Sequence, residues 1–307
     1  MSIIASVTVK IFLLLIVGFL TAKFSILNEE VKHSLSDLLV YVFLPANLLL
    51  SSQEEFSVSH LIGIGTTTVI TVLYYIVVIG VCYQAGKLFL QDKKKRGIFA
   101  LLVAFANTGF VGMSIIGETV PGAGMLYAAI YNCVFDIIYF SVGILLLQEN
   151  EGKVSLKTVM NNPIIWISLS SVLLYVIPYR FPAVVTGAIE PLAGCMLPVS
   201  MLIIGAEIYS IRWKDLLSDR LAYVTGFLRM IFLPLVVFAV MLLCRIQSEV
   251  AMTVVLLTAM PSASLNVIMS RKYNAHPEYA AITIMQNTIL MVISLPVFLY
   301  LCKTYLN

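Results

Sequence analysis

The 307-residue sequence has few charged residues. Asp, Glu, Lys and Arg together make up 11% of it, whereas soluble domains carry about a quarter. Because 60% of the residues are hydrophobic, the chain lacks the polar shell that a soluble protein of this size needs, and lipid is its main solvent. The formal net charge of +3 is small, and the positive residues form short clusters rather than one basic face. This distribution excludes nucleic acid as a partner.

The sequence also lacks the usual motifs of catalysis and of nucleotide or metal binding. No GxSxG, GxxxxGK(S/T) or GxGxxG stretch occurs, so neither a hydrolase nor an ATP-driven pump is supported. The histidines lack ligand spacing, and the cysteines stand alone in apolar runs: His33, His60, His276, Cys82, Cys133, Cys195, Cys244 and Cys302. We therefore expect no enzyme activity, no cofactor and no metal site, and any work must draw on ion or substrate gradients.

Long apolar runs dominate the chain, and about 20 such residues span the hydrocarbon layer once as a helix. Ten runs qualify, at residues 3–23, 33–51, 61–85, 97–117, 122–147, 161–178, 184–210, 220–244, 249–270 and 277–302. Lys10 interrupts the first run and no cleavage pattern follows it, so we interpret it as a retained span rather than a signal peptide. The sequence predicts an all-α integral membrane protein with ten transmembrane helices.

The distribution of positive residues predicts the orientation. Of the 19 Lys and Arg residues, 14 fall in alternate connections on one side: Lys23, Lys32, Lys87, Lys93, Lys94, Lys95, Arg96, Lys153, Lys157, Arg212, Lys214, Arg220, Arg271 and Lys272. Three lie on the other side, namely Arg180, Arg245 and Lys303. Positive residues concentrate in cytoplasmic loops, so both termini are predicted outside, in a plasma or inner membrane.

The second half of the chain repeats features of the first at a displacement of about 153 residues. Three matches carry this observation: Leu44-Pro45 with Leu197-Pro198, Glu54 with Glu207, and Ala128–Ile130 with Ala280–Ile282. Because each half holds five spans, an odd number, the second copy must enter the membrane from the opposite face. The sequence thus predicts two inverted five-helix repeats, 1–152 and 153–307.

Inverted repeats often bring two interrupted helices together at the membrane midplane. The fourth run contains Asn107, Thr108, Gly109 and Gly112, which are poor helix formers. The matching ninth run contains Pro261, Ser262, Ala263, Ser264 and Asn266, and proline removes a helical hydrogen bond. Two breaks at matching positions favour a substrate site. The alternative is that glycine and serine allow close helix packing and that proline kinks a helix.

At these positions the sequence resembles the auxin efflux carrier family, which includes the plant PIN-FORMED carriers and bacterial carboxylate permeases. The resemblance covers essentially the whole chain, and its motifs are Asn-Thr-Gly-Phe-x-Gly at 107–112 and Met-Pro-Ser-Ala at 260–263. It implies a scaffold from spans one, two, six and seven, a mobile transport domain from spans three to five and eight to ten, crossing helices four and nine, and elevator movement. Bacterial relatives often show proline where this chain has Ser114, which predicts a gentler first break.

The start of a broken helix carries unpaired N–H groups and the positive end of the helix dipole, which favours a carboxylate as cargo. The sequence predicts a secondary transporter of a small organic anion; malate, malonate or an indole acid would fit. A channel or uncoupled facilitator for anions is the alternative, although no filter-like stretch is visible. A receptor or membrane enzyme would need a larger soluble domain. Two copies could associate through the scaffold as a homodimer.

Asp136 is the one acid well inside a span, where a carboxylate costs about 3 kcal/mol. Asn132 lies one helical turn before it, and Arg229 lies at a similar predicted depth in the eighth run. Two roles remain open for Asp136. It either forms a static ion pair with Arg229 or couples transport to a proton or cation.

Overall fold

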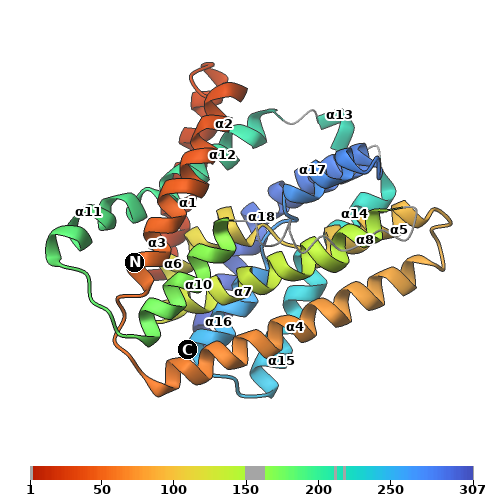
Figure 1. The fold of residues 1–307 in the computed structure, drawn as a ribbon. Helices are drawn as coiled ribbons and strands as arrows, with labels where there is room; N and C mark the ends of the chain where they lie inside the picture. The colour runs from red at the N-terminus through yellow and green to blue at the C-terminus, as the bar shows by residue number, and fades with distance from the viewer. Residues whose placement is uncertain (1–2, 149–162, 211–212, 217–218, 307) are drawn as a thin grey trace.

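The structure is a computed structural model, and it describes residues 3–148, 163–210, 213–216 and 219–306. These residues form helices and no β-strand (Figure 1). The only β-type pairing among them is an isolated antiparallel bridge between Ala106 and Ser262. The predicted boundary between the two repeats, at 152–153, lies outside the described residues, as do Lys153, Lys157 and Arg212.

The described part of the first half forms eight α-helices and three five-residue π-helical segments, labelled η, of which η1 and η3 each join two α-helices directly. They are α1 (Ile3–Lys23), α2 (Glu29–Leu38), η1 (Leu39–Phe43), α3 (Leu44–Ser51), α4 (Val58–Gly86), α5 (Lys93–Ala104), η2 (Thr108–Gly112), α6 (Met113–Thr119), α7 (Gly124–Ile138), η3 (Tyr139–Gly143) and α8 (Ile144–Leu147). In η2 the π-helical segment opens the helix that α6 continues, directly after the first break.

The described part of the second half follows a similar course. Its elements are α10 (Pro163–Val176), α11 (Ala183–Gly194), α12 (Met196–Ser210), α13 (Trp213–Leu216), α14 (Arg220–Phe227), η4 (Leu228–Phe232), α15 (Leu233–Leu243), α16 (Ser248–Thr258), α17 (Leu265–Lys272) and α18 (Pro277–Tyr305).

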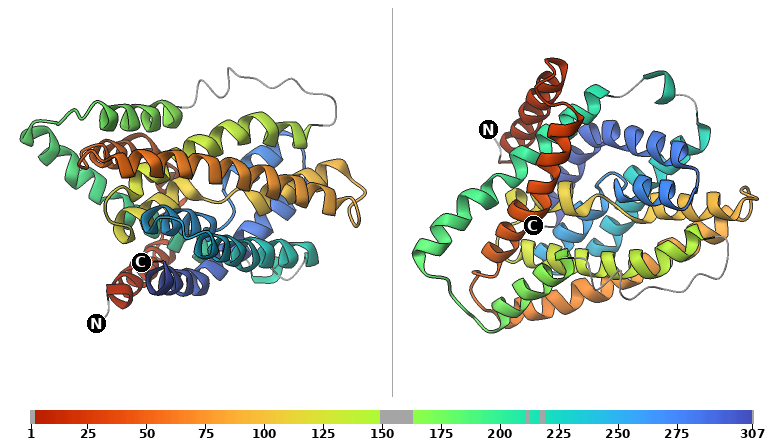
Figure 2. Two further views of the ribbon diagram at one scale, coloured as in Figure 1. Left: turned by 90° about the horizontal axis from the view of Figure 1, so that it is seen from below. Right: turned by 45° about the horizontal axis from the view of Figure 1, so that its top comes forward.

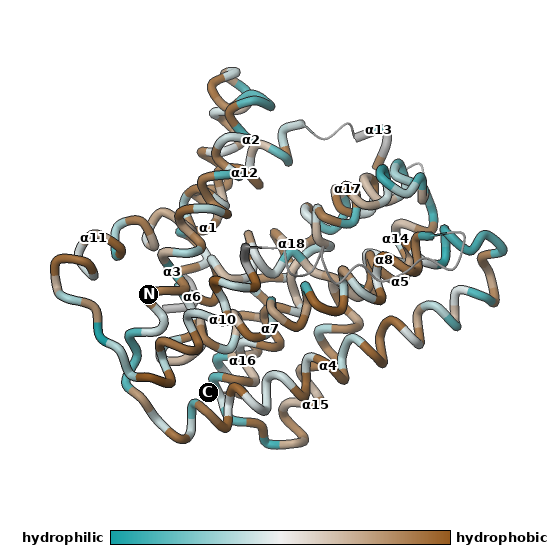
Figure 3. Tube along the Cα trace, in the orientation of Figure 1, coloured by the Kyte–Doolittle hydropathy of each residue, from teal (hydrophilic) through white to brown (hydrophobic). Residues whose placement is uncertain are grey.

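Seven helical stretches of the described chain are long and apolar enough to cross a membrane. They are Ser6–Lys23, Glu29–Ser51, Val58–Gly86, Gly124–Leu147, Ala183–Ser210, Arg220–Leu243 and Pro277–Tyr305, and each overlaps one predicted span. Figure 3 shows hydrophobic residues along the middle of these helices and hydrophilic ones toward α2, α13 and α17. The three other predicted spans contain shorter helices: α10, the α5–α6 pair and the α16–α17 pair. The chain is a multi-pass membrane protein.

Two glycines allow α1 and α12 to pack closely side by side (Figure 1). A Cβ added to Gly18 would lie 2.3 Å from the Leu202 carbonyl oxygen, and one added to Gly205 would lie 2.2 Å from that of Leu15. Small residues permit such close contact between membrane helices. Together with α3, which packs on α10 and α11, these helices form the left part of Figure 1. The helices α4, α6, α7, α15 and α18 pack on α16, and α4, α8, α14, α17 and α18 pack on α5.

An aromatic cluster holds the segment that follows α5. The Phe105 ring stacks on Tyr75, with centroids 4.6 Å apart, and meets Phe135 and Tyr139 edge-on at 5.0 and 4.8 Å. Offset stacking and edge-to-face contacts are the favoured geometries of aromatic pairs. All four rings are buried, so the chain is anchored at the residue where α5 has just ended.

Candidate crossover site

Regular helix ends and resumes within both spans for which the sequence predicts a break. The irregular segment between α5 and η2 covers residues 105–107, and that between α16 and α17 covers 259–264. Pro261, which has no N–H, lies in the longer segment. Ser114 lies inside α6, where its hydroxyl donates to the Phe110 carbonyl at 2.6 Å. The first irregular segment is thus shorter than the second, and Ser114 lies within the helix that follows it.

The two irregular segments lie against each other inside the bundle (Figure 2) and pair through their backbones. The contacts are the bridge of Ala106 with Ser262, the Asn107 N–H donating to the Pro261 carbonyl at 2.7 Å, and the Ala263 N–H donating to the Phe105 carbonyl at 2.9 Å. Backbone groups freed by a break cannot face lipid without a large cost. Here each broken helix supplies partners for the other.

A hydroxyl and an asparagine pair behind each broken segment. The Thr108 hydroxyl donates to Asn132 Oδ1 at 2.7 Å, and Asn287 Nδ2 donates to the Ser262 hydroxyl at 2.9 Å. Thr108 and Ser262 are 154 positions apart, and Asn132 and Asn287 are 155 apart, which is within two residues of the repeat displacement of about 153. Sequence reasoning missed Asn287, because the displacement of about 153 leads from Asn132 to Met285, two residues before it.

The four carbonyls at the C-terminal end of α5 all have partners, as helix ends in an apolar interior require. The Leu101 carbonyl accepts from the Phe105 N–H at 2.9 Å and from Asn266 Nδ2 at 3.4 Å. The Leu102 carbonyl accepts from the Ser262 hydroxyl at 2.5 Å. Ser262 and Asn266, both predicted site residues, thus complete a helix end.

The guanidinium of Arg229 donates hydrogen bonds to the C-terminal ends of both α5 and α16. It lies in η4, is fully buried, and donates to four backbone carbonyls and one hydroxyl. The acceptors are Val103 O at 2.9 Å, Ala104 O at 3.2 Å, Thr258 O at 2.5 Å, Met260 O at 3.1 Å and Tyr74 Oη at 2.8 Å. The last two carbonyls of α5 and the last of α16 therefore share one cation.

The geometry bears on one of the two roles left open for Asp136, the ion pair with Arg229, and leaves the coupling role a prediction. The described part of the chain holds no ion pair between them, because the guanidinium is directed to the helix ends instead. Asp136 lies buried on α7, 7% exposed, one turn after Asn132. Depth in the membrane, which suggested the pairing, does not determine which face of a helix a side chain occupies.

A cavity of about 250 Å³ lies between the crossing segments and the helices α2 and α12. Its lining is His33, Ser36, Asp37, Leu39, Asn107, Phe110, Val111, Ser200, Ile203, Ile204, Glu207, Ser264 and Ile268. Asn107 and Ser264 are the residues that precede the first turns of η2 and α17, and neither side chain caps its own helix. The starts of both resumed helices thus border the cavity.

The other predicted site residues lie in the crossing but do not line this cavity. Thr108, Ser262 and Asn266 are buried, and their side chains form hydrogen bonds within the crossing. A Cβ on Gly112 would lie 2.6 Å from Leu257 Cδ2, so this glycine allows α16 to pack closely. Gly109 and Ala263 likewise belong to the crossing itself. The close-packing interpretation thus describes Gly112, whereas a substrate site at the crossing stays a prediction.

Three titratable side chains line the cavity at α2 and α12. His33 Nδ1 lies 3.2 Å from Asp37 Oδ2, and Glu207 faces them from α12. Neither Lys nor Arg is among the lining residues. Within the described residues, no group of three or more His, Cys, Asp or Glu side chains could hold a metal ion.

Membrane-spanning helices, a crossing of two broken ones and a small polar cavity beside it are the features of a membrane transport protein. The model of the family described as "Membrane transport protein" matches residues 3–161 and 152–299. The chain belongs to this family, which confirms the resemblance seen in its motifs. It is a family of transporters, not of enzymes.

Several curated relatives align along nearly the whole chain. The uncharacterized transporter YfdV of Escherichia coli K12 is 21% identical over 312 residues, covering 95% of this chain and 96% of the relative. An uncharacterized transporter of Methanothermobacter thermautotrophicus is 22% identical over 292 residues, covering 94% and 95%. The uncharacterized transporter MJ1031 of Methanocaldococcus jannaschii is 21% identical over 281 residues, covering 87% and 88%.

Proposed function

We propose that the protein is a secondary transporter of a small organic anion, a carboxylate such as malate, malonate or an indole acid, which binds in the 250 Å³ cavity. One observation carries this proposal. The negative ends of the two broken helices are bound by Arg229, whereas the starts of the resumed helices border the cavity without a side-chain cap.

Helix starts favour anions because each carries about +0.5 of an elementary charge. At α17 the N–H groups of Asn266, Val267 and Ile268 already donate to backbone carbonyls, so the helix dipole rather than free N–H groups carries this preference there. Asn107, Ser200 and Ser264 add neutral hydrogen-bonding groups to the lining. The volume falls just below the roughly 300 to 1,000 Å³ of drug-sized ligand sites, which suits a cargo of a few carbon atoms.

The proposed mechanism is alternating access of the elevator type by two inverted repeats of five helices. The cavity lies between α2 and α12, from the proposed scaffold, and the crossing, from the proposed transport domain. Residues within two positions of one repeat apart contact each other at the centre: Tyr74 with Arg229 at 2.8 Å, and Asn107 with Pro261 at 2.7 Å. Lys10 on α1 and Glu118 on α6 form an ion pair at 2.7 Å between these two groups, which movement of the domain would break.

The test is exchange of labelled for unlabelled malonate in proteoliposomes, with a panel of mono- and dicarboxylates as competitors. A carrier shows saturable counterflow and a channel does not. Asn107→Ala removes a polar group at a helix start, and we expect a loss of roughly 1 to 2 kcal/mol, or about 5- to 30-fold in apparent affinity. Ser264→Ala should lower the affinity in the same direction.

Asn47→Ala is the matched control, because Asn47 lies half-buried on α3 and is not among the cavity residues. It should bind and exchange cargo as the wild type does. Wild-type affinity for both Asn107→Ala and Ser264→Ala would show that cargo binds elsewhere. Absence of counterflow with every carboxylate tested, in protein that remains folded, would refute the proposed cargo.

A further inference from the structure

We propose that Arg229 is the resident cation of a carbonyl-lined site between the C-terminal ends of α5 and α16, and that this site accepts a free guanidinium ion once the side chain is removed. The site is separate from the cavity proposed for the cargo, since Arg229 is not among the lining residues. Its existence does not depend on which cargo the protein carries.

The site is built from backbone atoms that other contacts hold in place. Val103 and Ala104 supply carbonyls from one helix end, and Thr258 and Met260 supply them from the other. All four residues are buried. A planar guanidinium with five donors matches such a divergent set of acceptors, whereas a compact ammonium reaches fewer of them.

Charge balance explains why a cation occupies this place. Each helix C-terminus carries about −0.5 of an elementary charge, so two of them together offset about one positive charge. The charge of Arg229 is therefore compensated although no carboxylate of the described chain is among its hydrogen-bond partners. A neutral side chain would leave both helix ends uncompensated in a buried site.

The repeat supplies an independent observation. Tyr74 lies 155 positions before Arg229, and its hydroxyl accepts from the guanidinium while donating to the Ala104 carbonyl at 3.1 Å. Two residues within two positions of repeat equivalence thus bind the same helix end, one with a hydroxyl and one with a charge. Because Tyr74 is neutral and Arg229 is charged, only one cation of the described chain occupies this site.

Arg229 is by this argument a positioning residue. It holds α5 and α16 end to end, and the backbone pairing of residues 105–107 with 261–263 then places Asn107 and Ser264 at the cavity. This last step rests on the proposed function, whereas occupancy of the carbonyl site does not.

The experiment uses purified Arg229→Ala protein and free guanidinium at low millimolar concentration, far below the denaturing range. A ligand that binds the folded state stabilises it, so guanidinium should raise the melting temperature of Arg229→Ala and leave that of the wild type unchanged. Urea has the same planar shape without charge and should not stabilise the variant. No stabilisation by guanidinium, or equal stabilisation by urea, would overturn the proposal whatever the cargo is.

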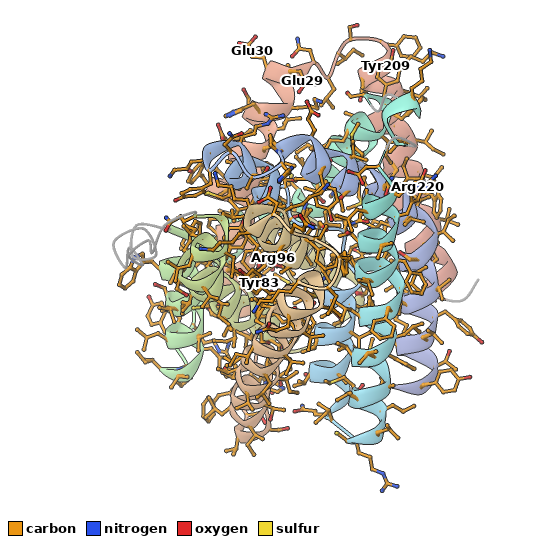
Figure 4. All side chains as sticks on the ribbon, turned by 90° about the vertical axis from the view of Figure 1, so that its right-hand side faces the viewer. Glu29, Glu30, Tyr83, Arg96, Tyr209 and Arg220 are labelled. Carbon is orange, nitrogen blue, oxygen red and sulfur yellow. The ribbon has the colours of Figure 1, made fainter. Side chains whose placement is uncertain are left out.

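Transport provides the second measurement. Counterflow by Arg229→Ala should fall by about tenfold or more, because buried carbonyls lose their partners, and guanidinium should restore it several-fold. Arg229→Met fills the space with apolar atoms and should not respond to guanidinium. Arg220→Ala is the matched control, since this exposed residue begins the same span (Figure 4).

Should Arg229→Ala fail to fold, Arg229→Lys and Arg229→Gln decide the question. The lysine keeps one charge and the glutamine keeps neutral donors of similar reach. The proposal requires a higher melting temperature and faster exchange for Arg229→Lys than for Arg229→Gln. Equal values would show that charge has no role at this site.

Discussion

Glu207 is the residue that distinguishes an anionic from a cationic cargo most directly. It lines the cavity from α12, opposite His33 and Asp37 of α2, and its repeat counterpart Glu54 is not among the lining residues. A carboxylate near a bound anion repels it, whereas the same carboxylate near a bound cation attracts it. The sign of a mutational effect at this position therefore reports the charge of the cargo.

We expect Glu207→Gln to bind the proposed anion more tightly than the wild type. Removing one like charge across a hydrated cavity should gain about 1 kcal/mol, or roughly fivefold in apparent affinity. The measurement is the half-saturation concentration for malonate exchange at mildly alkaline pH, where carboxyl groups are ionised. Glu190→Gln, on an exposed position of α11, makes the same chemical change outside the cavity and serves as the control. Weaker binding by Glu207→Gln would point to a cationic cargo instead.

At the scale of elements, a polar contact joins two loops at one end of the broken helices. His276 Nε2 lies 2.5 Å from Asp92 Oδ2, which links the connection before α5 with the connection before α18. Asp92 Oδ1 also caps α5 by accepting from the Lys94 N–H at 2.8 Å. The hydrogen bond from His276 holds the pKa of Asp92 below its ordinary value.

This contact predicts a pH dependence of stability. Because the pKa of Asp92 is lowered in the folded state, its contribution is complete above the ordinary aspartate pKa of about 3.9 and is lost as the pH falls through the lower folded value. His276→Asn keeps a residue that tolerates the φ of 51° found there. Its melting temperature should be slightly below that of the wild type at neutral pH.

The same difference should vanish in acid, once Asp92 is protonated. Asp92→Asn, which retains a residue able to cap α5, should flatten the pH dependence in the same way. The effect is small because both side chains are partly exposed to solvent, at 37% and 50%. A difference between wild type and His276→Asn that persists unchanged at low pH would exclude Asp92 as its source.

At the scale of the whole molecule, the charged ends of the helices define the orientation to be tested. Glu29, Glu30, Tyr209 and Arg220 lie toward one end of the bundle in Figure 4, while both termini lie on the left of Figure 1, away from α13. The positive-inside rule then gives a prediction of which end faces the cytoplasm. Placement in the plasma or inner membrane, and a homodimer through the scaffold, remain proposals.

Both termini are expected outside and residues 93–96 inside. Single cysteines introduced at positions 2 and 94, in a chain whose five native cysteines have been replaced, should differ in labelling by an impermeant maleimide on intact cells. Position 2 should react and position 94 should react only after permeabilisation. The reverse pattern would place the cavity mouth at α2 and α12 on the outer side.

The sequence by itself determined the features that depend on neighbours along the chain. Apolar length predicted the membrane helices, and Pro261 with the Asn-Thr-Gly stretch at 107–109 predicted where two of them end, because a missing N–H or a poor helix former acts on its own turn. The longer spans were predicted best, since twenty apolar residues have few alternatives in a membrane.

Only the tertiary structure decided which groups form hydrogen bonds with the backbone at the two helix breaks. The carbonyls that bind Arg229 lie 29 to 126 positions away in the chain, Asn287 completes Ser262 from α18, and the cavity wall comes from α2 and α12. A helix break creates unpaired backbone groups locally, but the sequence around it does not specify what will pack there. These buried backbone groups are paired by side chains from distant helices. Arg229 therefore binds the helix ends rather than Asp136, the carboxylate at a similar predicted depth.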